Sequence, residues 1–224
     1  MIAFVLAAAL SAPPKMTDGE ALFRTRCSSC HGLNLQGGPQ APPLLNTDAG
    51  YVDFMLQTGR MPAEAPWVQE FDKAPDFTHA QMRSLVAYVM SKSSGDKALP
   101  AFHSNGDVSR GRSVYAENCA QCHSATGGGN NVGYRNEAPP LRTSTPLEIA
   151  EAVREGPDVM PKFGPRVIDQ RRLDDLIAYV GWLQKANYNA GGLSFSNWGP
   201  ISEGFVAWAF GVSLLVLLCR RLGT

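Results

Sequence analysis

The pentapeptide Cys27-Ser28-Ser29-Cys30-His31 recurs 92 positions later as Cys119-Ala120-Gln121-Cys122-His123. In the pattern Cys-x-x-Cys-His, two cysteines can form thioether bonds with one porphyrin while the adjoining histidine binds its iron. A disulfide would leave the histidine unexplained, and a zinc site would require the two motifs to merge. The sequence therefore predicts two covalently bound c-type haems. Their predicted attachment and proximal residues are Cys27, Cys30, Cys119, Cys122, His31 and His123.

Length and charge narrow the class of protein further. The chain has 224 residues, which is enough for two small domains and a tail. Its 20 basic side chains balance its 20 acidic ones, so the formal net charge is zero. Domains that bind nucleic acid carry a strongly basic face. We therefore expect no nucleic-acid partner.

The chain contains an internal repeat that extends beyond the haem motifs. The matching segments are Gly19-x3-Phe23 and Gly111-x3-Tyr115, residues 41–44 and 138–141, and residues 85–89 and 176–180. Self-similarity of this kind marks two copies of one supersecondary unit. Each copy is predicted to contain a helix, the haem motif, a Pro-Pro loop, a Met-Pro loop and a closing helix. In each first helix the glycine and the aromatic residue are four positions apart and share one face.

This order of motifs resembles the class I cytochrome c domain, a small all-α fold wrapped around one haem. In that family the first and last helices cross where a glycine meets an aromatic ring. The resemblance implies two tandem class I domains, over residues 15–94 and 107–188, joined by a linker at 95–106. Because so small a domain has little core of its own, loss of haem is expected to unfold it.

The carboxyl end predicts a membrane anchor. Residues 204–219 carry no charge and are followed by Arg220 and Arg221. After a linker at 189–200, residues 201–221 are predicted to form one transmembrane helix in contact with lipid, with a buried core helix as the alternative. Basic residues favour the cytoplasmic side. We therefore expect a cytoplasmic carboxyl terminus and both haems on the outer side of the cytoplasmic membrane.

The amino end has an apolar run, at residues 1–10, followed by Ser11-Ala12-Pro13-Pro14. A small residue near the end of an apolar run is typical of a signal-peptidase site, although the usual basic start is missing. Residues 1–14 are therefore expected to be a signal peptide or leader.

The sixth ligand of each iron decides the chemistry. A haem with an open sixth position can bind oxygen, peroxide or substrate, whereas a haem closed by a methionine sulfur only passes electrons. After residue 100 the one methionine is Met160, between the haem motif and the closing helix, and the free histidine, His103, precedes the first helix of its domain. Class I cytochromes carry their axial methionine in this loop. Met160 is therefore predicted to be a ligand, with a core methionine as the alternative.

Several methionines compete in the first copy. Met61 stands before a proline, as Met160 does, and is predicted to be the axial ligand of the first haem. The closing helix is predicted over residues 78–91. The competing residues, which are expected to pack in the core, lie in a helix or be exposed, are Met55, Met82, Met90 and His79.

The Pro-Pro loops are expected to orient the proximal histidines. A ligating histidine usually donates its other ring N–H to an acceptor, which fixes its tautomer. In the class I family that acceptor is a proline carbonyl after the motif. Pro43 and Pro140 are the predicted acceptors, with Pro42 and Pro139 or a simple turn as alternatives.

A closer resemblance is carried by residues 30–37, 58–63, 156–163 and 199–204. They resemble the dihaem cytochrome c subunits of the bacterial quinol–cytochrome c reductases called cytochrome bcc, and the two motifs followed by one anchor make the likeness specific. By that resemblance, a cytochrome b subunit oxidises menaquinol and a Rieske iron–sulfur protein passes electrons to these haems. An aa3-type cytochrome c oxidase then receives them. The chain itself would carry out electron transfer as a subunit of the reductase.

Two other functions remain open from the residues alone. One is an anchored dihaem electron donor to a different terminal oxidase or reductase. The other is a dihaem redox enzyme such as a peroxidase or a thiosulfate dehydrogenase. That second class needs a vacant or unusually ligated iron, and the two Met-Pro loops argue against it.

Overall fold

The computed structural model of the chain describes residues 18–66, 71–133, 136–185 and 200–223. It divides into two units, Met1–Gln184 and Lys185–Thr224, and each is described by itself. The predicted leader at 1–14 and all but the last residue of the predicted linker at 189–200 lie outside the described residues.

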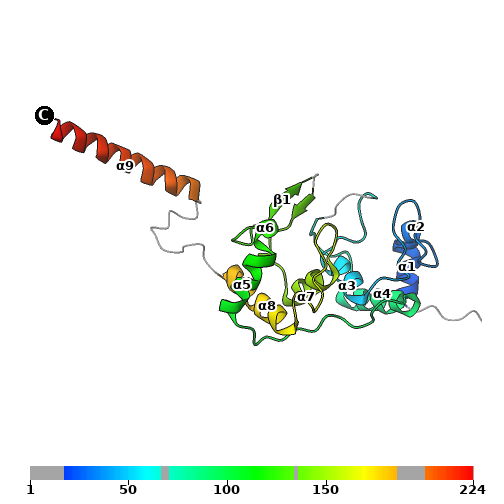
Figure 1. Cartoon of the computed structure of the whole chain (residues 1–224). Coiled ribbons are helices and arrows are strands. Elements are labelled where there is room, and N and C mark those ends of the chain that lie inside the picture. Colours follow the sequence, from blue (N-terminus) through cyan, green and yellow to red (C-terminus); the bar gives the residue numbers. More distant parts are fainter. Residues whose placement is uncertain (1–17, 67–70, 134–135, 186–199, 224) are drawn as a thin grey trace, which may run out of the picture. The chain divides into compact units, whose positions relative to one another are not determined.

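The first unit contains both copies of the repeat in chain order (Figure 1). The helices of the first copy are α1 (Asp18–Arg26), α2 (Ser28–His31), α3 (Ala49–Gln57) and α4 (His79–Lys92). Those of the second copy are α5 (Val108–Asn118), α6 (Ala120–His123), α7 (Pro146–Glu155) and α8 (Gln170–Lys185). In both copies a helix leads into one short turn of helix that ends at the motif histidine. The predicted tandem helical fold is confirmed.

A small β-hairpin departs from the purely helical expectation. Strands β1 (Asn130–Gly133) and β2 (Asn136–Ala138) pair antiparallel in the second copy, with Asn130 opposite Ala138. The segment is rich in glycine and asparagine and has no alternating apolar pattern, so its strands were not predicted. Val132 and Ala138 bring the hairpin to the wall of the second cavity described below.

Side-chain caps fix the start of the later helices. Thr78 forms a reciprocal capping box with Gln81 at the start of α4, and Thr145 forms one with Glu148 at the start of α7. Asp107 accepts a hydrogen bond from the backbone N–H of Arg110 at the start of α5. Each cap satisfies a backbone donor that the first helical turn leaves without a partner.

The first and last helices of each copy cross at the predicted glycine. A Cβ atom on Gly19 would lie 2.0 Å from the carbonyl oxygen of Ser84, so only glycine lets α1 approach α4 this closely. In the second copy a Cβ on Gly111 would lie 1.9 Å from the carbonyl oxygen of Asp175 on α8. The aromatic partners, Phe23 with Tyr88 and Tyr115 with Tyr179, lie at the same ring-centroid distance of 5.3 Å. The predicted Gly/aromatic crossing is confirmed in both copies.

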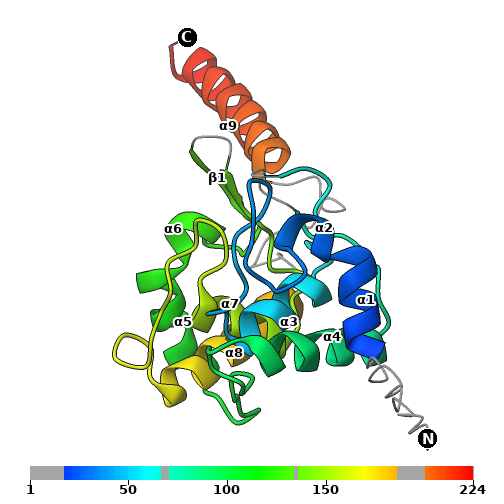
Figure 2. The ribbon, with the colours of Figure 1, turned by 90° about the vertical axis from the view of Figure 1, so that its right-hand side faces the viewer.

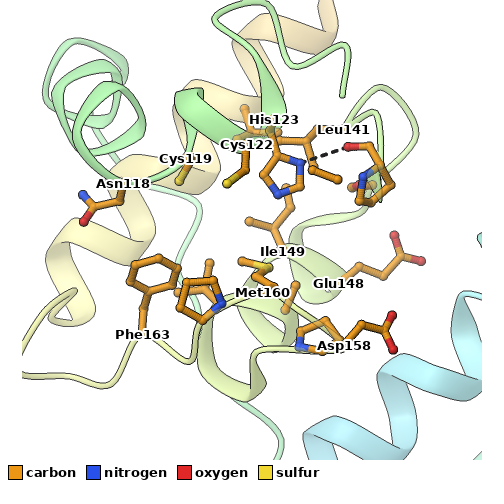
Figure 3. A pocket seen from close by; sticks show the side chains of 18 of the residues that line it. Asn118, Cys119, Cys122, His123, Leu141, Glu148, Ile149, Asp158, Met160 and Phe163 are labelled. Atoms are coloured by element: carbon orange, nitrogen blue, oxygen red, sulfur yellow. Dashed lines mark hydrogen bonds between the residues drawn. The ribbon is translucent and has the colours of Figure 1, made fainter. Parts of the chain in front are cut away.

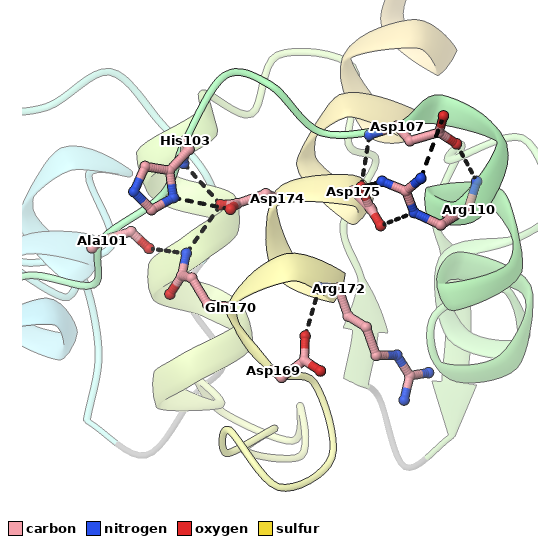
Figure 4. Close-up of polar contacts among 9 residues, drawn as sticks. All are labelled: Ala101, His103, Asp107, Arg110, Asp169, Gln170, Arg172, Asp174 and Asp175. Atoms are coloured by element: carbon pink, nitrogen blue, oxygen red, sulfur yellow. Dashed lines mark hydrogen bonds and ion pairs between the residues drawn. The ribbon is translucent and has the colours of Figure 1, made fainter.

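Additional polar contacts hold the helix crossing in the second copy (Figure 4). The carboxylate of Asp175, which is 2% exposed, accepts hydrogen bonds from the Arg110 guanidinium and from the backbone N–H of Asp107. The neighbouring Asp174 accepts from the backbone N–H of His103 and lies 3.0 Å from its ring Nδ1. These bonds tie the segment before α5 to the first turns of α8.

Each copy has its own hydrophobic core. The first core includes the buried side chains of Phe23, Leu35, Met82, Leu85, Val89 and Met90. The second includes those of Tyr115, Ile149, Val153, Leu173, Leu176 and Val180. The expectation that Met82 and Met90 pack in the core is confirmed. Burying each of these side chains stabilises the folded domain by roughly 1.5–3 kcal/mol. A domain this small buries few of them, so its core alone gives modest stability.

The two copies meet along α3 and α7, which lie side by side in both views (Figures 1 and 2). Lys162 of the second copy forms an ion pair of 3.1 Å with Asp48 of the first. A fully buried acid, Glu151 of α7, lies beside Asp53 of α3 at this seam. The two copies therefore form one compact unit.

The second unit contains one long helix, α9 (Pro200–Leu222). Its stretch Gly204–Leu222 is long and apolar enough to cross a membrane, and none of it is buried within the chain. A soluble core helix would be largely covered by other elements. This observation supports the predicted anchor rather than the core-helix alternative.

Candidate haem sites

The first copy contains a cavity of about 590 Å³. Its wall brings together the four residues predicted for one haem, Cys27, Cys30, His31 and Met61. Apolar side chains from α1, α3, α4 and the Pro-Pro loop cover much of the remaining wall: Phe23, Leu44, Val52, Leu56, Leu85 and Val89. The volume falls in the range of about 300–1,000 Å³ that is usual for cofactor sites.

The second copy repeats this arrangement around a cavity of about 520 Å³. Cys119, Cys122, His123 and Met160 all line it. Figure 3 shows His123 and Met160 on opposite sides of the cavity, with both cysteines on the side of His123. A flat ring that enters between His123 and Met160 therefore meets two thiols at its edge.

Backbone carbonyls hold both motif histidines by Nδ1. The ring Nδ1 of His31 lies 2.9 Å from the carbonyl oxygen of Pro42, and that of His123 lies 2.9 Å from the carbonyl oxygen of Pro139 (Figure 3). When Nδ1 donates its proton to a carbonyl, the lone pair of Nε2 is free to bind a metal. Both rings are therefore held in the tautomer that suits a proximal ligand.

The predicted acceptors Pro43 and Pro140 are wrong, because the first proline of each pair takes that role. Successive carbonyls of an extended backbone point to opposite sides, so only one of two adjacent prolines can face the histidine. A backbone hydrogen bond from the residue after each proline pair determines which of the two carbonyls faces the histidine. The backbone N–H of Leu44 donates to the Leu35 carbonyl, and that of Leu141 donates to the Gly127 carbonyl.

Burial keeps Cys27, Cys119 and His123 neutral. It raises the pKa of the Cys27 thiol to about 11, against a smaller opposing effect of Arg26, and raises that of Cys119 to about 12. Burial also lowers the pKa of His123, partly offset by its hydrogen bond to Pro139. At neutral pH His123 is therefore uncharged, the form in which an imidazole binds a metal.

The loop that carries Met160 is fastened to the helix before it. Helix α7 ends at Gly156, whose left-handed backbone (φ 61°) reverses the chain. Arg154, near the end of α7, donates to the carbonyl oxygens of Phe163 at 2.9 Å and Ile168 at 2.6 Å. These bonds bracket the loop, so Met160 is presented to the cavity from a fixed position.

The first cavity has a second methionine in its wall. The backbone N–H of Met61 donates to the carbonyl oxygen of Met55 at 3.0 Å, and the side chains of both residues line the cavity. Met55 lies on α3 and is 6% exposed. His79 is exposed at the start of α4, as expected, and His103 is engaged by Asp174. The structure thus brings Met61 to the site and adds Met55 as a neighbour.

Two charged residues that sequence reasoning missed lie in the walls of both cavities. These are Arg60, which directly precedes Met61, and Asp158, two positions before Met160. Arg60 belongs to the first copy and Asp158 to the second, so each copy contributes a charge to the other's cavity. Their positions beside the Met-Pro sequences were the available signal. The contact between α3 and α7 that brings them together was not visible in the sequence.

The donor set fits haem c. Each cavity supplies two thiols three positions apart, an imidazole fixed by Nδ1 and a methionine thioether. The mainly apolar walls suit a porphyrin face. Within the described residues no group of three or more His, Cys, Asp or Glu side chains could hold a bare metal ion. The two thiols, the imidazole, the thioether and the apolar walls of each cavity suit an iron carried by a porphyrin.

Two cavities of this kind, each under a Gly/aromatic helix crossing, define a two-domain c-type cytochrome. The family model described as cytochrome c matches residues 16–93, and the model described as cytochrome c oxidase, cbb3-type, subunit III matches residues 106–180. The chain belongs to the family of cytochrome bc1 complex cytochrome c subunits. Two cytochrome c domains support covalently bound haem c, one in each. Together with α9, this membership supports a single-pass membrane protein.

Three relatives illustrate the likeness. The cytochrome bc1 complex cytochrome c subunit of Corynebacterium efficiens is 33% identical over 93% of this chain and 76% of its own length. The protein of the same name from Mycobacterium tuberculosis H37Rv is 35% identical over 93% of this chain and 77% of its own. The cbb3-type cytochrome c oxidase subunit CcoP of an Azospirillum strain is 28% identical, over 74% of this chain and 61% of its own.

Proposed function

We propose that this chain is the membrane-anchored dihaem cytochrome c of a quinol–cytochrome c reductase, and that it relays electrons from a Rieske centre to an aa3-type oxidase. The observation that carries the proposal is the pair of adjoining cavities. Each is lined by two cysteines, a histidine and a methionine, and the two cavities have Arg60 and Asp158 in common. Two redox centres that share wall residues suit a relay in series.

The proposed ligand sets follow from the geometry. Cys27 and Cys30 would hold the first haem, and Cys119 and Cys122 the second. The proposed axial pairs are His31 with Met61 and His123 with Met160. A haem closed by histidine and methionine exchanges single electrons at a raised potential and leaves no position for a substrate. The arrangement therefore favours electron transfer over a peroxidase-like activity.

The protein's own part is to hold these ligands still. The carbonyls of Pro42 and Pro139 orient the two imidazoles, and Arg154 fastens the loop of Met160. Apolar walls keep water away from most of each ring. Rigid ligands and a dry pocket reduce the reorganisation that accompanies each electron exchange, because few groups need to move when the charge changes.

Partners and orientation follow from the family and the anchor. Cytochrome b and Rieske subunits are the proposed partners because relatives 33–35% identical are named as subunits of bc1 complexes. The proposed electron source is menaquinol, oxidised by those partners. Arg220 and Arg221 lie at the carboxyl end of the anchor, and basic residues favour the cytoplasmic side. The carboxyl terminus would therefore lie in the cytoplasm and both haems on the outer side of the membrane.

The test is isolation of the tagged full-length chain from membranes in mild detergent. We expect two covalent haems per chain, recovery with cytochrome b and a Rieske protein, and reduction by a menaquinol analogue that stops when the Rieske protein is removed. Recovery of an aa3-type oxidase tests the acceptor. Protease sensitivity of a carboxyl-terminal tag in sealed, right-side-out cells would contradict the proposed sidedness.

A second candidate rests on the likeness of residues 106–180 to cbb3-type subunit III. By that likeness the chain could donate electrons to a different terminal oxidase. Co-isolation separates the two functions. Recovery with an oxidase but with neither cytochrome b nor a Rieske protein would favour the second candidate and reject the first.

A further inference from the structure

Arg60 is a buried cation at the boundary of both haem cavities. It is 5% exposed, and it is one of the two charged residues that line both cavities. The other, Asp158, is exposed to solvent. Solvent screens an exposed charge strongly and a buried one weakly. Arg60 is therefore the shared residue whose charge acts on both cavities at close range.

The described surroundings of Arg60 do not satisfy its guanidinium. Nη1 forms an ion pair with Asp72, whose side chain is 43% exposed, and the guanidinium lies 4.9 Å from the centre of the Phe54 ring. Nε is buried and has no hydrogen-bond partner among the residues that the structure describes. A buried donor without an acceptor is destabilising, and more so when the group is charged. An acceptor that enters with the cofactor would remove this cost.

Only a few chemical groups suit the acceptor that Arg60 requires. A guanidinium presents its N–H groups as a planar fork that matches a carboxylate. The porphyrin of haem c carries two propionate carboxylates on one edge, and those are its only anionic side groups. Among the described residues, the one carboxylate that pairs with Arg60 is that of Asp72, which approaches Nη1 and leaves Nε open.

Building on the proposed function, we propose that Arg60 binds a haem propionate and serves as a shared positive charge that raises the reduction potentials of both haems. A cation near an iron favours the reduced, less positive state. Because Arg60 lies in the walls of both cavities, its removal should lower both potentials. Asp72 opposes Arg60, so its neutralisation should raise both.

The experiment measures the two midpoint potentials of the full-length dihaem protein by redox titration of its absorbance. For Arg60→Gln we expect both one-electron reduction constants to fall by roughly tenfold, which corresponds to about 59 mV each. Asp72→Asn should shift both the other way by a smaller factor. Arg60→Lys keeps the charge but loses the planar fork, so it should shift both less than Arg60→Gln.

A matched control is available in the first copy. Arg26 lines only the first cavity and pairs with the exposed Asp76. Arg26→Gln should leave the second potential unchanged. A shift of one potential alone in Arg60→Gln would overturn the shared role. If Arg60→Gln does not fold, Asp72→Asn and Arg60→Lys decide: unchanged potentials in both would also overturn it.

These measurements distinguish failure of the Arg60 proposal from failure of the proposed function. If the unmodified protein lacks the sulfur-to-iron absorption band on either haem, the proposed ligand set fails, whatever Arg60 does. If both bands are present and the potentials do not respond to Arg60 or Asp72, the ligand set stands and the shared cation is rejected.

Discussion

The two cytochrome domains are built on one plan but held by different polar contacts. In both, a glycine on the first helix meets a backbone carbonyl of the last, Ser84 in one and Asp175 in the other. The side chain of Asp175 binds Arg110, whereas the Ser84 hydroxyl donates back to Ala80 within its own helix. Close packing at the helix crossing is thus common to both domains, whereas among the described residues only the second domain has an ion pair there, between Arg110 and Asp175.

The largest expected effects test whether the two sites are equivalent. Met160→Ala and Met61→Ala should each convert only their own haem to a high-spin form that accepts added ligands. Each should lower the potential of that haem by on the order of 0.2 V, within the span of about 0.8 V that axial ligands set. Absorption spectra and redox titration of the holoprotein measure both changes.

Met55→Leu is the matched control for the first site. It removes the other sulfur in that cavity while keeping a similar volume. Its spectrum should be unchanged. Loss of the sulfur-to-iron band in Met55→Leu, with the band retained in Met61→Ala, would transfer the ligand role to Met55 and make the two domains inequivalent.

Local signals made most of each site predictable, because the residues that matter are close in sequence. The haem motif, the glycine and aromatic of the first helix and the Met-Pro loop all lie in short segments of fixed spacing. The choice between Pro42 and Pro43 was not predictable in this way. It depends on the pairing of Leu44 with Leu35, which sets the direction of each carbonyl.

Contacts across the seam between the domains were beyond sequence reasoning for a different reason. Arg60, Asp53 and Glu151 acquire their environments only when α3 packs on α7, and the repeat describes each copy by itself. Neither periodicity nor spacing indicates which faces of two copies will meet. The hairpin was missed because its glycines and asparagines carry no periodic pattern.

The shared helix crossing predicts equal sensitivity in both domains. Gly19→Ala and Gly111→Ala each place a methyl group within 2.0 Å of a backbone oxygen, which cannot move aside as a side chain would. Each should lower the free energy of unfolding by roughly 3 kcal/mol. Denaturant titration of the holoprotein, followed at the haem bands, measures this loss.

Gly181→Ala is the control for those variants. Gly181 lies within α8, and a Cβ there meets nothing within 4 Å. The same substitution should therefore stabilise the protein by about 0.5–1 kcal/mol through helix propensity alone. A loss at Gly111 without one at Gly19 would show that the two crossings are not equivalent.

The seam between the domains should respond to pH through Glu151. Burial, followed by the nearby Asp53 carboxylate, raises the pKa of Glu151 to about 9. Neither of its oxygens receives a hydrogen bond from the described part of the chain, whereas a protonated Glu151 can donate to Asp53. The folded protein therefore holds a proton that the unfolded chain releases above about pH 4.5, and stability should fall as pH rises from about 5 to 9.

Glu151→Gln removes that titration and keeps a neutral donor for Asp53. We expect a gain of about 1–2 kcal/mol at pH 8, little change at pH 5, and a flatter dependence of the free energy of unfolding on pH between them. Glu117→Gln, an exposed acid that pairs with Arg172, is the control and should retain the slope. If Glu151→Gln leaves the pH dependence of the free energy of unfolding unchanged, a group other than Glu151 holds the proton.

The smallest expected effect concerns the Arg110–Asp175 ion pair, which has no counterpart among the described residues of the first domain. The hydrogen bond from Arg110, helped by that from the Asp107 backbone, lowers the pKa of Asp175. A carboxyl group with a lowered folded pKa stabilises the protein above its unfolded pKa of about 3.9 and loses that contribution as pH falls below it. Asp175→Asn should thus cost about 1 kcal/mol at pH 7 and progressively less as pH falls below the unfolded pKa. Ser84→Ala, at the equivalent position of the first domain, should show no such pH dependence. Equal acid sensitivity of both variants would mean that the Arg110–Asp175 ion pair does not distinguish the domains.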